Sequence, residues 1–390
     1  MLRLEQIRRD IVALGQRAAR DQQTQRSALA LAQRWLADLP GNTDLRQHLQ
    51  PLLSGSSRWG GAIPCGDERL STPITCPDSP TDGLVVVGVD GSQIFPDRHA
   101  LTLYYLLQVG ALIFRYNGTA PTVHTAEWLR YEESELFDAH GYLMGSEALA
   151  MERMVKEMEV LADLVSSERP QAPGFIFGLS DGPLLWPYVN SEGDTVQKAR
   201  AAYLQALDRI KHADSVPVGY VDRPGGRPLL ELLQASQLQP EELLQRSDET
   251  PLGRLTDEQF LSQILSPGQR TPWFTRRTAA NQHHAAAGQE IWFCYVALGS
   301  HDDRAIARVE VPAWAAAHAT VTAALHGMLW HQASALNGYP YVLARAHEEA
   351  LVTTQDKVAL EQAIQSQLFE LGIVALPSNK ARQKALLGKR

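Results

Sequence analysis

The stretch Leu84-Val85-Val86-Val87-Gly88-Val89-Asp90-Gly91-Ser92 decides the fold. Its continuous β-branched run is typical of a strand buried on both faces, and this strand ends in an acid. A second such run, Gly174-Phe175-Ile176-Phe177-Gly178-Leu179, is followed by Asp181. Helical spacing over residues 146–165 predicts a helix between the two strands. A right-handed crossover through this helix would make the strands parallel neighbours, with Asp90 and Asp181 side by side at their carboxyl ends.

Two further strand-like runs follow the first strand, at residues 100–109 and 111–116. Gly110 separates them, and this spacing predicts a hairpin. The resulting order is strand, hairpin, helix, strand, with an acid at the end of each of the two buried strands. This order resembles the ribonuclease H arrangement. We therefore expect an α/β fold in which helices flank a mixed sheet.

The rest of the chain extends this core on both sides. Leu4, Ile7, Ile11 and Leu14 have the spacing of one helical face, whereas residues 41–83 are rich in Gly, Ser, Pro and Thr. We expect an N-terminal helical extension and linker over 1–80 and a main domain over 81–390. Later elements are predicted as a strand at 216–221, a hairpin of 290–296 with 307–311, and helices at about 316–336, 340–351 and 356–371, with no regular structure predicted over 229–290.

The composition is that of an ordinary globular protein, with 44% hydrophobic and 21% charged residues in 390. The uncharged stretch from Leu101 to Phe114 is shorter than the roughly 20 apolar residues of a membrane-spanning helix. The N-terminus has no apolar core of the kind that a secretory signal contains. We therefore expect a cytoplasmic protein with no membrane segment. The three cysteines are too few for a disulfide framework.

The net charge of −8 argues against a protein that coats nucleic acid, because Lys and Arg bind phosphates. Basic residues do gather locally. Trp273 and Phe274 lie among such residues and could form a loop that stacks on a single strand, or they could pack in an interface. The clusters are Arg270 with Arg276 and Arg277, and a tail with Lys380, Arg382, Lys384, Lys389 and Arg390.

The two aspartates predict a metal site. A lone Asp-Gly after a strand is usually a turn, but two carboxylates on neighbouring strands repel each other unless a cation lies between them. A helix carboxylate would complete the ligand set. Glu157 lies between Met154 and Leu161 on the apolar stripe, so it is the preferred candidate. Glu152 and Glu159 are alternatives, and a solvated glutamate is the plain reading of each.

Six motifs in order carry a resemblance to a known family. They are Val89-Asp90-Gly91-Ser92-Gln93, Arg153 with Glu157, Asp181-Gly182-Pro183-Leu184, Val218-Gly219-Tyr220-Val221, Ala307-Arg308-Val309-Glu310-Val311-Pro312, and Gly338-Tyr339-Pro340-Tyr341-Val342-Leu343 running into Ala346-His347. Over residues 84–360 the chain resembles the NurA nuclease domain. The resemblance implies manganese-dependent nucleases that act on DNA ends, assemble as dimers and work with a HerA-type hexameric ATPase.

The family's site residues map to Asp90, Glu157, Asp181, Tyr339 and His347. Without the resemblance, His347 would be interpreted as a core histidine between Leu343 and Leu351, and Tyr339 as a packing residue. At the site, a neutral imidazole could bind metal, and an imidazolium could protonate the leaving oxygen.

The expected activity is metal-dependent hydrolysis of phosphodiester bonds with two Mn²⁺ or Mg²⁺ ions. We expect 5′–3′ exonuclease action in end resection during DNA repair, with some single-strand endonuclease activity. Two alternatives stay open: a phosphoesterase of the same fold, and a non-catalytic adaptor for a DNA-translocating ATPase.

Overall fold

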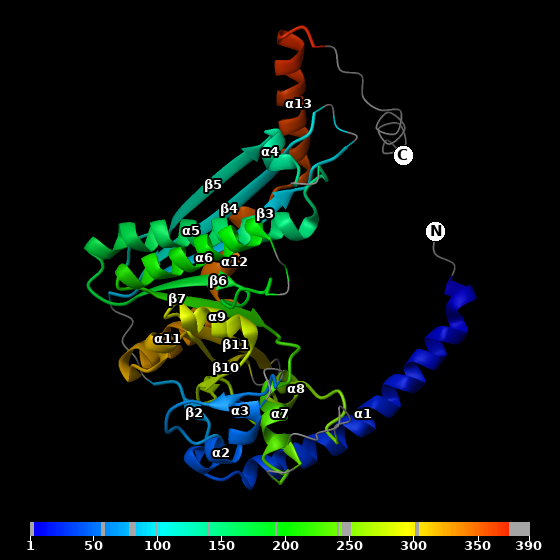
Figure 1. Cartoon of the computed structure of the whole chain (residues 1–390), viewed down its shortest axis with the longest axis vertical. Coiled ribbons are helices and arrows are strands. Elements are labelled where there is room, and N and C mark those ends of the chain that lie inside the picture. Colours follow the sequence, from blue (N-terminus) through cyan, green and yellow to red (C-terminus); the bar gives the residue numbers. More distant parts are fainter. Residues whose placement is uncertain are drawn as a thin grey trace. The chain divides into compact units, whose positions relative to one another are not determined.

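The computed structural model describes residues 4–55, 59–77, 83–98, 100, 102–138, 141–189, 191, 193–239, 242–243, 251–300 and 304–373. The chain divides into two compact units (Figure 1). Unit 1 comprises Met1–Pro80, Gly182–Leu185 and Gly219–Tyr339, and unit 2 comprises Thr81–Asp181, Trp186–Val218 and Pro340–Arg390. This division differs from the expected one at residue 80, because residues 1–80 share a unit with 219–339.

Unit 2 contains a mixed sheet. β3 (Val85–Ile94) and β6 (Ile176–Asp181) run parallel, in register from Val85↔Ile176 to Val89↔Ser180. β4 (Tyr105–Arg115) pairs antiparallel with β3 and with β5 (Thr122–Arg130), and β7 (Val216–Asp222) begins beside β6. The predicted parallel pairing through a crossover helix is therefore confirmed, and so is a mixed sheet flanked by helices.

The predicted hairpin at Gly110 is wrong. Gly110 lies in the middle of β4 and pairs with Asp90. A Cβ at this position would lie 2.3 Å from the backbone nitrogen of Ala350, so the glycine serves close packing against a helix and not a turn. The first strand also continues past Asp90 to Ile94.

Three helices matter for the position of the site in unit 2. α5 (Ser146–Glu168) and α6 (Asp194–His212) lie side by side, and α5 also packs on β3 and β6 (Figure 1). α12 (Tyr341–Ala350) packs on β3 and β4. The other helical segments of this unit are α4 (Glu133–Leu136), η2 (Arg169–Gln171) and α13 (Thr354–Glu370), the last of which buries no residue.

Unit 1 contains a second group of strands. β10 (Ile291–Gly299) and β11 (Arg304–Pro312) form the predicted hairpin, and β11 pairs with the end of β7 from Gly219 onward. Four two-residue strands complete the group: β1 (Ile63–Pro64), β2 (Ile74–Thr75), β8 (Gln269–Arg270) and β9 (Phe274–Thr275).

The helices of unit 1 include several that the sequence did not predict. Residues 41–83, expected as a linker, contain α2 (Asn42–His48) and α3 (Gln50–Gly55). The region without predicted structure contains α7 (Pro228–Ala235), α8 (Asp257–Leu261) and α9 (Ala279–Ala286). The remaining helices are η1 (Leu4–Ile7), α1 (Arg8–Ala37), α10 (Ala313–Ala316) and α11 (Ala319–Ser334).

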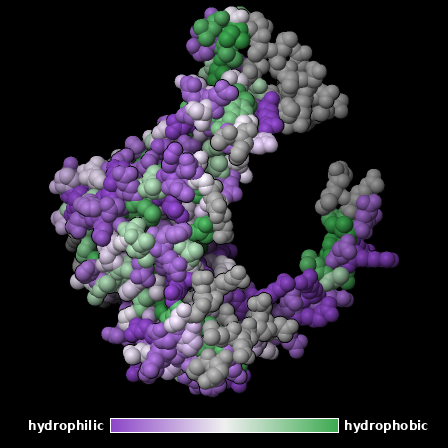
Figure 2. All heavy atoms as spheres, viewed as in Figure 1, coloured by the Kyte–Doolittle hydropathy of each residue, from purple (hydrophilic) through white to green (hydrophobic). Residues whose placement is uncertain are grey.

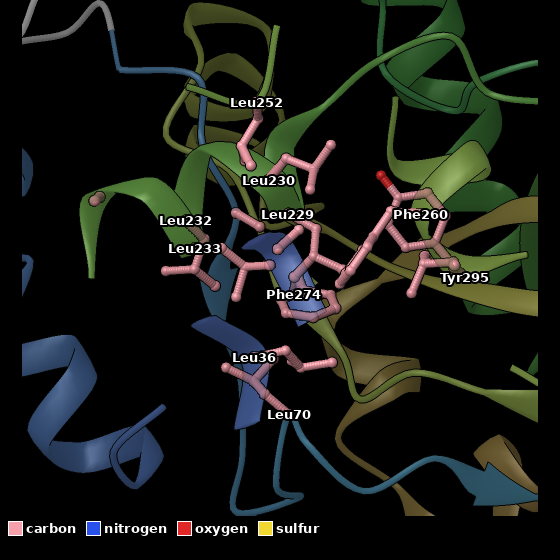
Figure 3. Close-up of a cluster of buried hydrophobic side chains, with 14 of the residues drawn as sticks. Leu36, Leu70, Leu229, Leu230, Leu232, Leu233, Leu252, Phe260, Phe274 and Tyr295 are labelled. Carbon is pink, nitrogen blue, oxygen red and sulfur yellow. The ribbon is translucent and has the colours of Figure 1, made fainter. Parts of the chain in front are cut away.

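The core of unit 1 explains why residues 1–80 belong to it. Leu36 of α1 and Leu70 converge on side chains of α7, including Leu232 and Leu233, and on Phe274 (Figure 3). The opposite end of the N-terminal helix is different, because its predicted apolar stripe is exposed (Figure 2). Among the described residues, no helix combines the length and apolarity that crossing a bilayer requires.

Candidate active site

Asp90 and Asp181 lie on neighbouring parallel strands. Each follows directly after the last pair of the parallel β3–β6 register, Val89↔Ser180. Asp90 is half-buried and Asp181 is exposed. The strand register thus brings the two predicted acids to adjacent positions at one end of the sheet, where open α/β sheets bind their ligands.

His347 contacts Asp90 directly. Its Nδ1 lies 2.6 Å from Oδ2 of Asp90, and Oδ1 of the same carboxylate accepts a hydrogen bond of 2.8 Å from the Gly91 backbone. The His347 side chain is 64% exposed, so the interpretation as a core histidine is wrong. The carboxylate orients the imidazole and leaves Nε2 to face solvent or a ligand.

Two glycines allow α12 to bring His347 this close. A Cβ at Gly88 would lie 2.7 Å from the carbonyl oxygen of Val342, and Gly110 makes the comparable approach to Ala350. The end of the helix is held by hydrogen bonds to backbone carbonyls. Gln108 donates to Glu349 O at 2.9 Å, and Ser92 Oγ donates to Ala350 O.

Glu157 reaches the site from α5, on the other face of β3. Successive residues of a strand point to opposite faces, so Asp90 faces α12 while Gly91 faces α5. A Cβ at Gly91 would lie 2.4 Å from Oε1 of Glu157. Glu157 is buried, and its Oε1 has no hydrogen-bond partner among the residues that the structure describes.

Arg153 is a site residue that the sequence argument did not assign. It lies one helical turn before Glu157, and its Nη1 donates a hydrogen bond of 2.6 Å to the Gly91 carbonyl. The same Nη1 lies 3.5 Å from Oε1 of Glu157. Arg153 therefore ties α5 to the strand that carries Asp90. The i, i+4 spacing of Arg and Glu was the available signal.

The charge balance at Glu157 is unusual. The pKa of its carboxyl is raised to about 7, mainly by burial; Arg153 opposes this rise, and Asp90 and Asp181 contribute to it. The carboxylates of Glu157, Asp90 and Asp181 therefore lie close enough to influence one another, and the guanidinium of Arg153 offsets only part of their charge. Such an excess of negative charge is stabilised by a cation.

The alternative glutamates have other partners. Glu152 accepts a hydrogen bond of 2.6 Å from the Tyr105 hydroxyl and one of 3.2 Å from Arg130. Glu159 pairs with Lys156 at 2.7 Å. These contacts occupy both side chains away from Asp90, which favours Glu157 as the site glutamate.

Two tyrosines differ in their relation to the site. Tyr188 of unit 2 has a raised pKa, first because of burial, with Glu147 and Glu157 raising it and Arg153 lowering it. It therefore lies among the same charges, and no sequence motif marked it. Tyr339, which the resemblance places at the site, belongs to unit 1, where its ring packs edge-on against Tyr220 at 5.5 Å.

The predicted DNA-binding loop is mostly interior. Arg270, Trp273 and Phe274 are buried, and Arg270 forms a bidentate ion pair with Glu68 at 2.6 and 3.0 Å. They belong to β8, β9 and their connection and not to an exposed loop. Of the other two residues, Arg276 is half-buried and Arg277 is exposed, and contact of this group with DNA stays a prediction. The basic tail at 380–390 lies outside the described residues.

The side chains at the site have the chemistry of a metal centre but not its closed geometry. Within the described part of the chain, no three His, Cys, Asp or Glu side chains stand close enough to form a ready-made metal cluster. What the site offers is hard oxygen donors, a buried carboxylate oxygen without a hydrogen bond among the described residues, and excess negative charge, and this chemistry suits a divalent cation.

Comparison with known proteins places these features in context. A crystal structure of NurA is similar with a TM-score of 0.36 and 13% identity, over 75% of this chain and 90% of that one. A crystal structure of NurA with manganese gives 0.37 and 12%, over 76% and 90%. Drosophila Piwi gives 0.30 and 12%, over 70% and 30%. No curated protein matches the chain. The NurA domain family matches residues 84–352, which is more than half of the sequence, and the chain therefore belongs to the NurA family.

Proposed function

We propose that this protein is a divalent-metal-dependent DNA nuclease that hydrolyses phosphodiester bonds. Membership of the NurA family supports a nuclease-related role. The observation that carries the proposal is the group of Asp90, Asp181 and Glu157 where the parallel pairing of β3 and β6 ends. Glu157 is a buried carboxylate whose Oε1 has no described hydrogen bond and only an ion pair of 3.5 Å with Arg153, and such perturbed charged groups gather at functional sites.

The metal would be Mn²⁺ or Mg²⁺, held by Asp90, Asp181 and Glu157. If a neutral His347 also binds the metal, as an alternative to donating a proton, the site favours Mn²⁺, because imidazole is a better ligand for Mn²⁺ than for Mg²⁺. When bound, two such ions would lower the pKa of the attacking water and stabilise charge on the leaving oxygen. A protein nucleophile is then not required.

The protein's own side chains would act around this centre. Asp90 holds the imidazole of His347 through Nδ1, so that Nε2 can deliver a proton to the leaving oxygen. Arg153 offsets part of the negative charge and, through its bond to the Gly91 carbonyl, keeps Glu157 against β3. This division leaves Arg153 as a positioning residue.

The substrate would be DNA ends, processed 5′ to 3′ in resection during repair, with a single-strand endonuclease activity beside it. The net charge of −8 supports weak DNA binding by the protein alone. We therefore propose a homodimer fed by a HerA-like hexameric ATPase, which would raise the effective concentration of DNA at the site.

The test is cleavage of end-labelled linear duplex and of closed circular DNA, with and without Mn²⁺, by wild type and by Asp90→Ala and Asp181→Ala. We expect Mn²⁺-dependent loss of linear substrate by wild type. In either variant the cleavage rate should be at least about 100-fold lower. Folded wild type without cleavage would favour the adaptor role. Hydrolysis of p-nitrophenyl phosphate without cleavage of DNA would favour a phosphoesterase.

A further inference from the structure

Two of the six motifs that resemble the NurA family have no role in the proposed catalysis. They are Val218-Gly219-Tyr220-Val221 and Ala307-Arg308-Val309-Glu310-Val311-Pro312. The first lies on β7 and the second on β11, and Glu310 is the register partner of Gly219 in the pairing of these strands. Both residues contact the segment Gly182–Leu185, which belongs to the same compact unit and follows directly after Asp181.

Glu310 contacts this segment through a buried carboxylate. The residue is only 2% exposed. Its Oε2 accepts a hydrogen bond of 2.9 Å from the backbone N–H of Leu184, and its Oε1 lies 2.9 Å from Nη2 of Arg308. Arg308 stands two positions earlier on β11 and therefore on the same face of the strand. One carboxylate oxygen thus pairs with the guanidinium, and the other binds the segment after Asp181.

Gly219 makes room for the segment on β7. A Cβ at Gly219 would lie 2.7 Å from the backbone nitrogen of Leu184 and 2.9 Å from the carbonyl oxygen of Gly182. The backbone of the segment therefore lies directly on the strand, at the position opposite Glu310. Any side chain at residue 219 would displace it.

The backbone N–H groups of the segment are held on both sides of its proline. The N–H of Gly182 donates to the carbonyl of Tyr220 at 2.7 Å, Pro183 has no N–H, and the N–H of Leu184 donates to Glu310. Gly182 has a φ of 120°, which side chains rarely adopt, so the turn after β6 requires glycine. A backbone held immediately after Asp181 restricts where that carboxylate can lie.

Stability alone does not account for a buried ion pair at this place. Replacing such a pair with apolar residues is often neutral or stabilising, because both charges lose their hydration when they are buried. What the carboxylate of Glu310 provides is an acceptor for the Leu184 N–H, at a position that Arg308 fixes. Side chains that bind metal ions depend on such outer contacts for their orientation.

We propose that Glu310 is a positioning residue for Asp181. It holds the segment that follows Asp181 through the Leu184 N–H, while Arg308 holds Glu310 in place. The carboxylate of Asp181 is thereby oriented for a divalent cation. This inference rests on the proposed function, because it takes Asp181 as a metal ligand. Glu310 itself touches neither metal nor substrate.

The first test needs neither metal nor DNA. Glu310→Met and Glu310→Gln both remove the charge and keep the length of the side chain, but glutamine retains an amide oxygen that can accept from Leu184. Hydrogen exchange of the metal-free full chain is followed by mass spectrometry of the peptide that contains Leu184. Exchange there should be about tenfold faster in Glu310→Met than in Glu310→Gln. Equal exchange in the two variants would overturn the proposal.

The second test measures Mn²⁺ directly, by calorimetry for binding and by DNA cleavage at a series of Mn²⁺ concentrations. Glu310→Met should raise the Kd for Mn²⁺ and the half-saturating Mn²⁺ concentration about tenfold or more. The cleavage rate at saturating Mn²⁺ should stay within about threefold of wild type, because no reacting group is removed. Glu310→Gln should restore the Kd to within about threefold of wild type.

A second variant acts on the same segment and leaves the carboxylate intact. Gly219→Ala places a Cβ against the backbone of Leu184 and should also raise the Kd for Mn²⁺. It tests the proposal even where Glu310→Met does not fold. An unchanged Kd in folded Gly219→Ala would contradict the proposed positioning.

Asp257→Asn is the matched control for a general loss of stability in unit 1. Asp257 is also a buried carboxylate, and it accepts hydrogen bonds from the backbone of Leu229 and Leu230 and from the Tyr295 hydroxyl, at 2.8, 3.0 and 2.6 Å. Asp257→Asn should lower the midpoint of thermal unfolding and leave the Kd for Mn²⁺ unchanged. A rise in Kd equal to that of Glu310→Met would assign the effect to stability and overturn the proposal.

The wild type separates a failure of this proposal from a failure of the nuclease proposal. If it binds Mn²⁺ but cleaves no DNA, the nuclease proposal alone fails. If it cleaves DNA with Mn²⁺ while Glu310→Met and Gly219→Ala keep its Kd for Mn²⁺, the positioning proposal alone fails. If it binds no Mn²⁺, both fail.

Discussion

Nδ1 of His347 lies 2.6 Å from Oδ2 of Asp90, although the two residues are 257 positions apart in the sequence. The contact joins α12 to β3 and fixes which imidazole nitrogen remains available.

His347→Ala should lower the rate of Mn²⁺-dependent DNA cleavage about 100-fold, because the variant loses a proton donor at the leaving oxygen. The midpoint of thermal unfolding should change little, since the side chain is exposed. His212→Ala is the control, as His212 is an exposed histidine of the same unit that pairs with Asp208. A cleavage rate for His347→Ala within twofold of wild type would remove His347 from the mechanism.

Glu157→Gln should abolish cleavage yet stabilise the metal-free fold at alkaline pH. The folded-state pKa of about 7 lies above the ordinary 4.5, so ionisation costs the folded protein stability as pH rises between these values. The variant's gain over wild type should grow from pH 4.5 to 7 and level off at no more than about 3 kcal/mol. Urea unfolding at several pH values measures the difference.

Two controls accompany this prediction. Glu159→Gln removes a carboxylate that pairs with Lys156 and should show no such gain with pH. Mn²⁺ should raise the unfolding midpoint of wild type but not of Glu157→Gln. A stability difference that does not vary with pH would mean that Glu157 does not carry a buried charge.

Gly110→Ala should destabilise the protein by about 1–3 kcal/mol, because the added Cβ would lie 2.3 Å from the backbone of Ala350. Activity should fall as well, since α12 carries His347. Gly15→Ala is the matched control: a Cβ added there would have nothing within 4 Å, and alanine favours the helix. Equal stability of the two variants would show that α12 does not depend on this close approach.

The protein should form a homodimer through the exposed stripe of Leu4, Ile7, Ile11 and Leu14 at the start of the chain. Light scattering at micromolar concentration should report twice the mass of one chain. Ile11→Asp should shift the population toward monomer, while Gln16→Asp on the same helix should not. A wild-type monomer would rule out the dimer.

Processing of long duplex at about 0.15 M salt should require the HerA-like ATPase and ATP hydrolysis. With a net charge of −8, few phosphate contacts must carry all of the nuclease's own affinity, so that affinity should fall steeply as salt rises. Resection assays with and without the ATPase, at low and physiological salt, measure this dependence. Fast resection by the protein alone at physiological salt would show that its own affinity for DNA is sufficient, and would contradict this prediction.

The sequence predicted the part of the site that follows from strand order. Two apolar runs, each followed by an acid, and a helix between them were enough to predict that Asp90 and Asp181 are neighbours, because crossover handedness leaves little choice. His347 came from the family resemblance alone. No local pattern reveals that α12 crosses β3 and β4. This packing depends on glycines, and a glycine is equally typical of a turn, which is why Gly110 was predicted to lie in a hairpin turn.

Other features depend on distant partners. Arg270 was predicted to be an exposed cation, but it is buried in an ion pair with Glu68. Glu68 lies 202 positions away in the sequence, so no local pattern indicated this pair. Arg153 was part of a quoted motif, but its role became clear only from its hydrogen bond to the Gly91 carbonyl. The strand β5 was missed because its exposed positions include the apolar Val123 and Leu129 and its half-buried positions include Arg130, so the alternation that marks a half-buried strand is weak.

The composition of unit 1 has a consequence for how the protein is made. Its core joins Leu36 and Leu70 to residues from Leu229 onward, so the first 80 residues leave the ribosome long before their partners exist. At about 5–20 residues per second, the segment waits for many seconds with its apolar side chains uncovered. During that interval the nascent chain is exposed to aggregation, and a chaperone that shields residues 28–70 would protect it. A truncation that removed the first 80 residues would expose the apolar side chains of α7 that pack against Leu36 and Leu70.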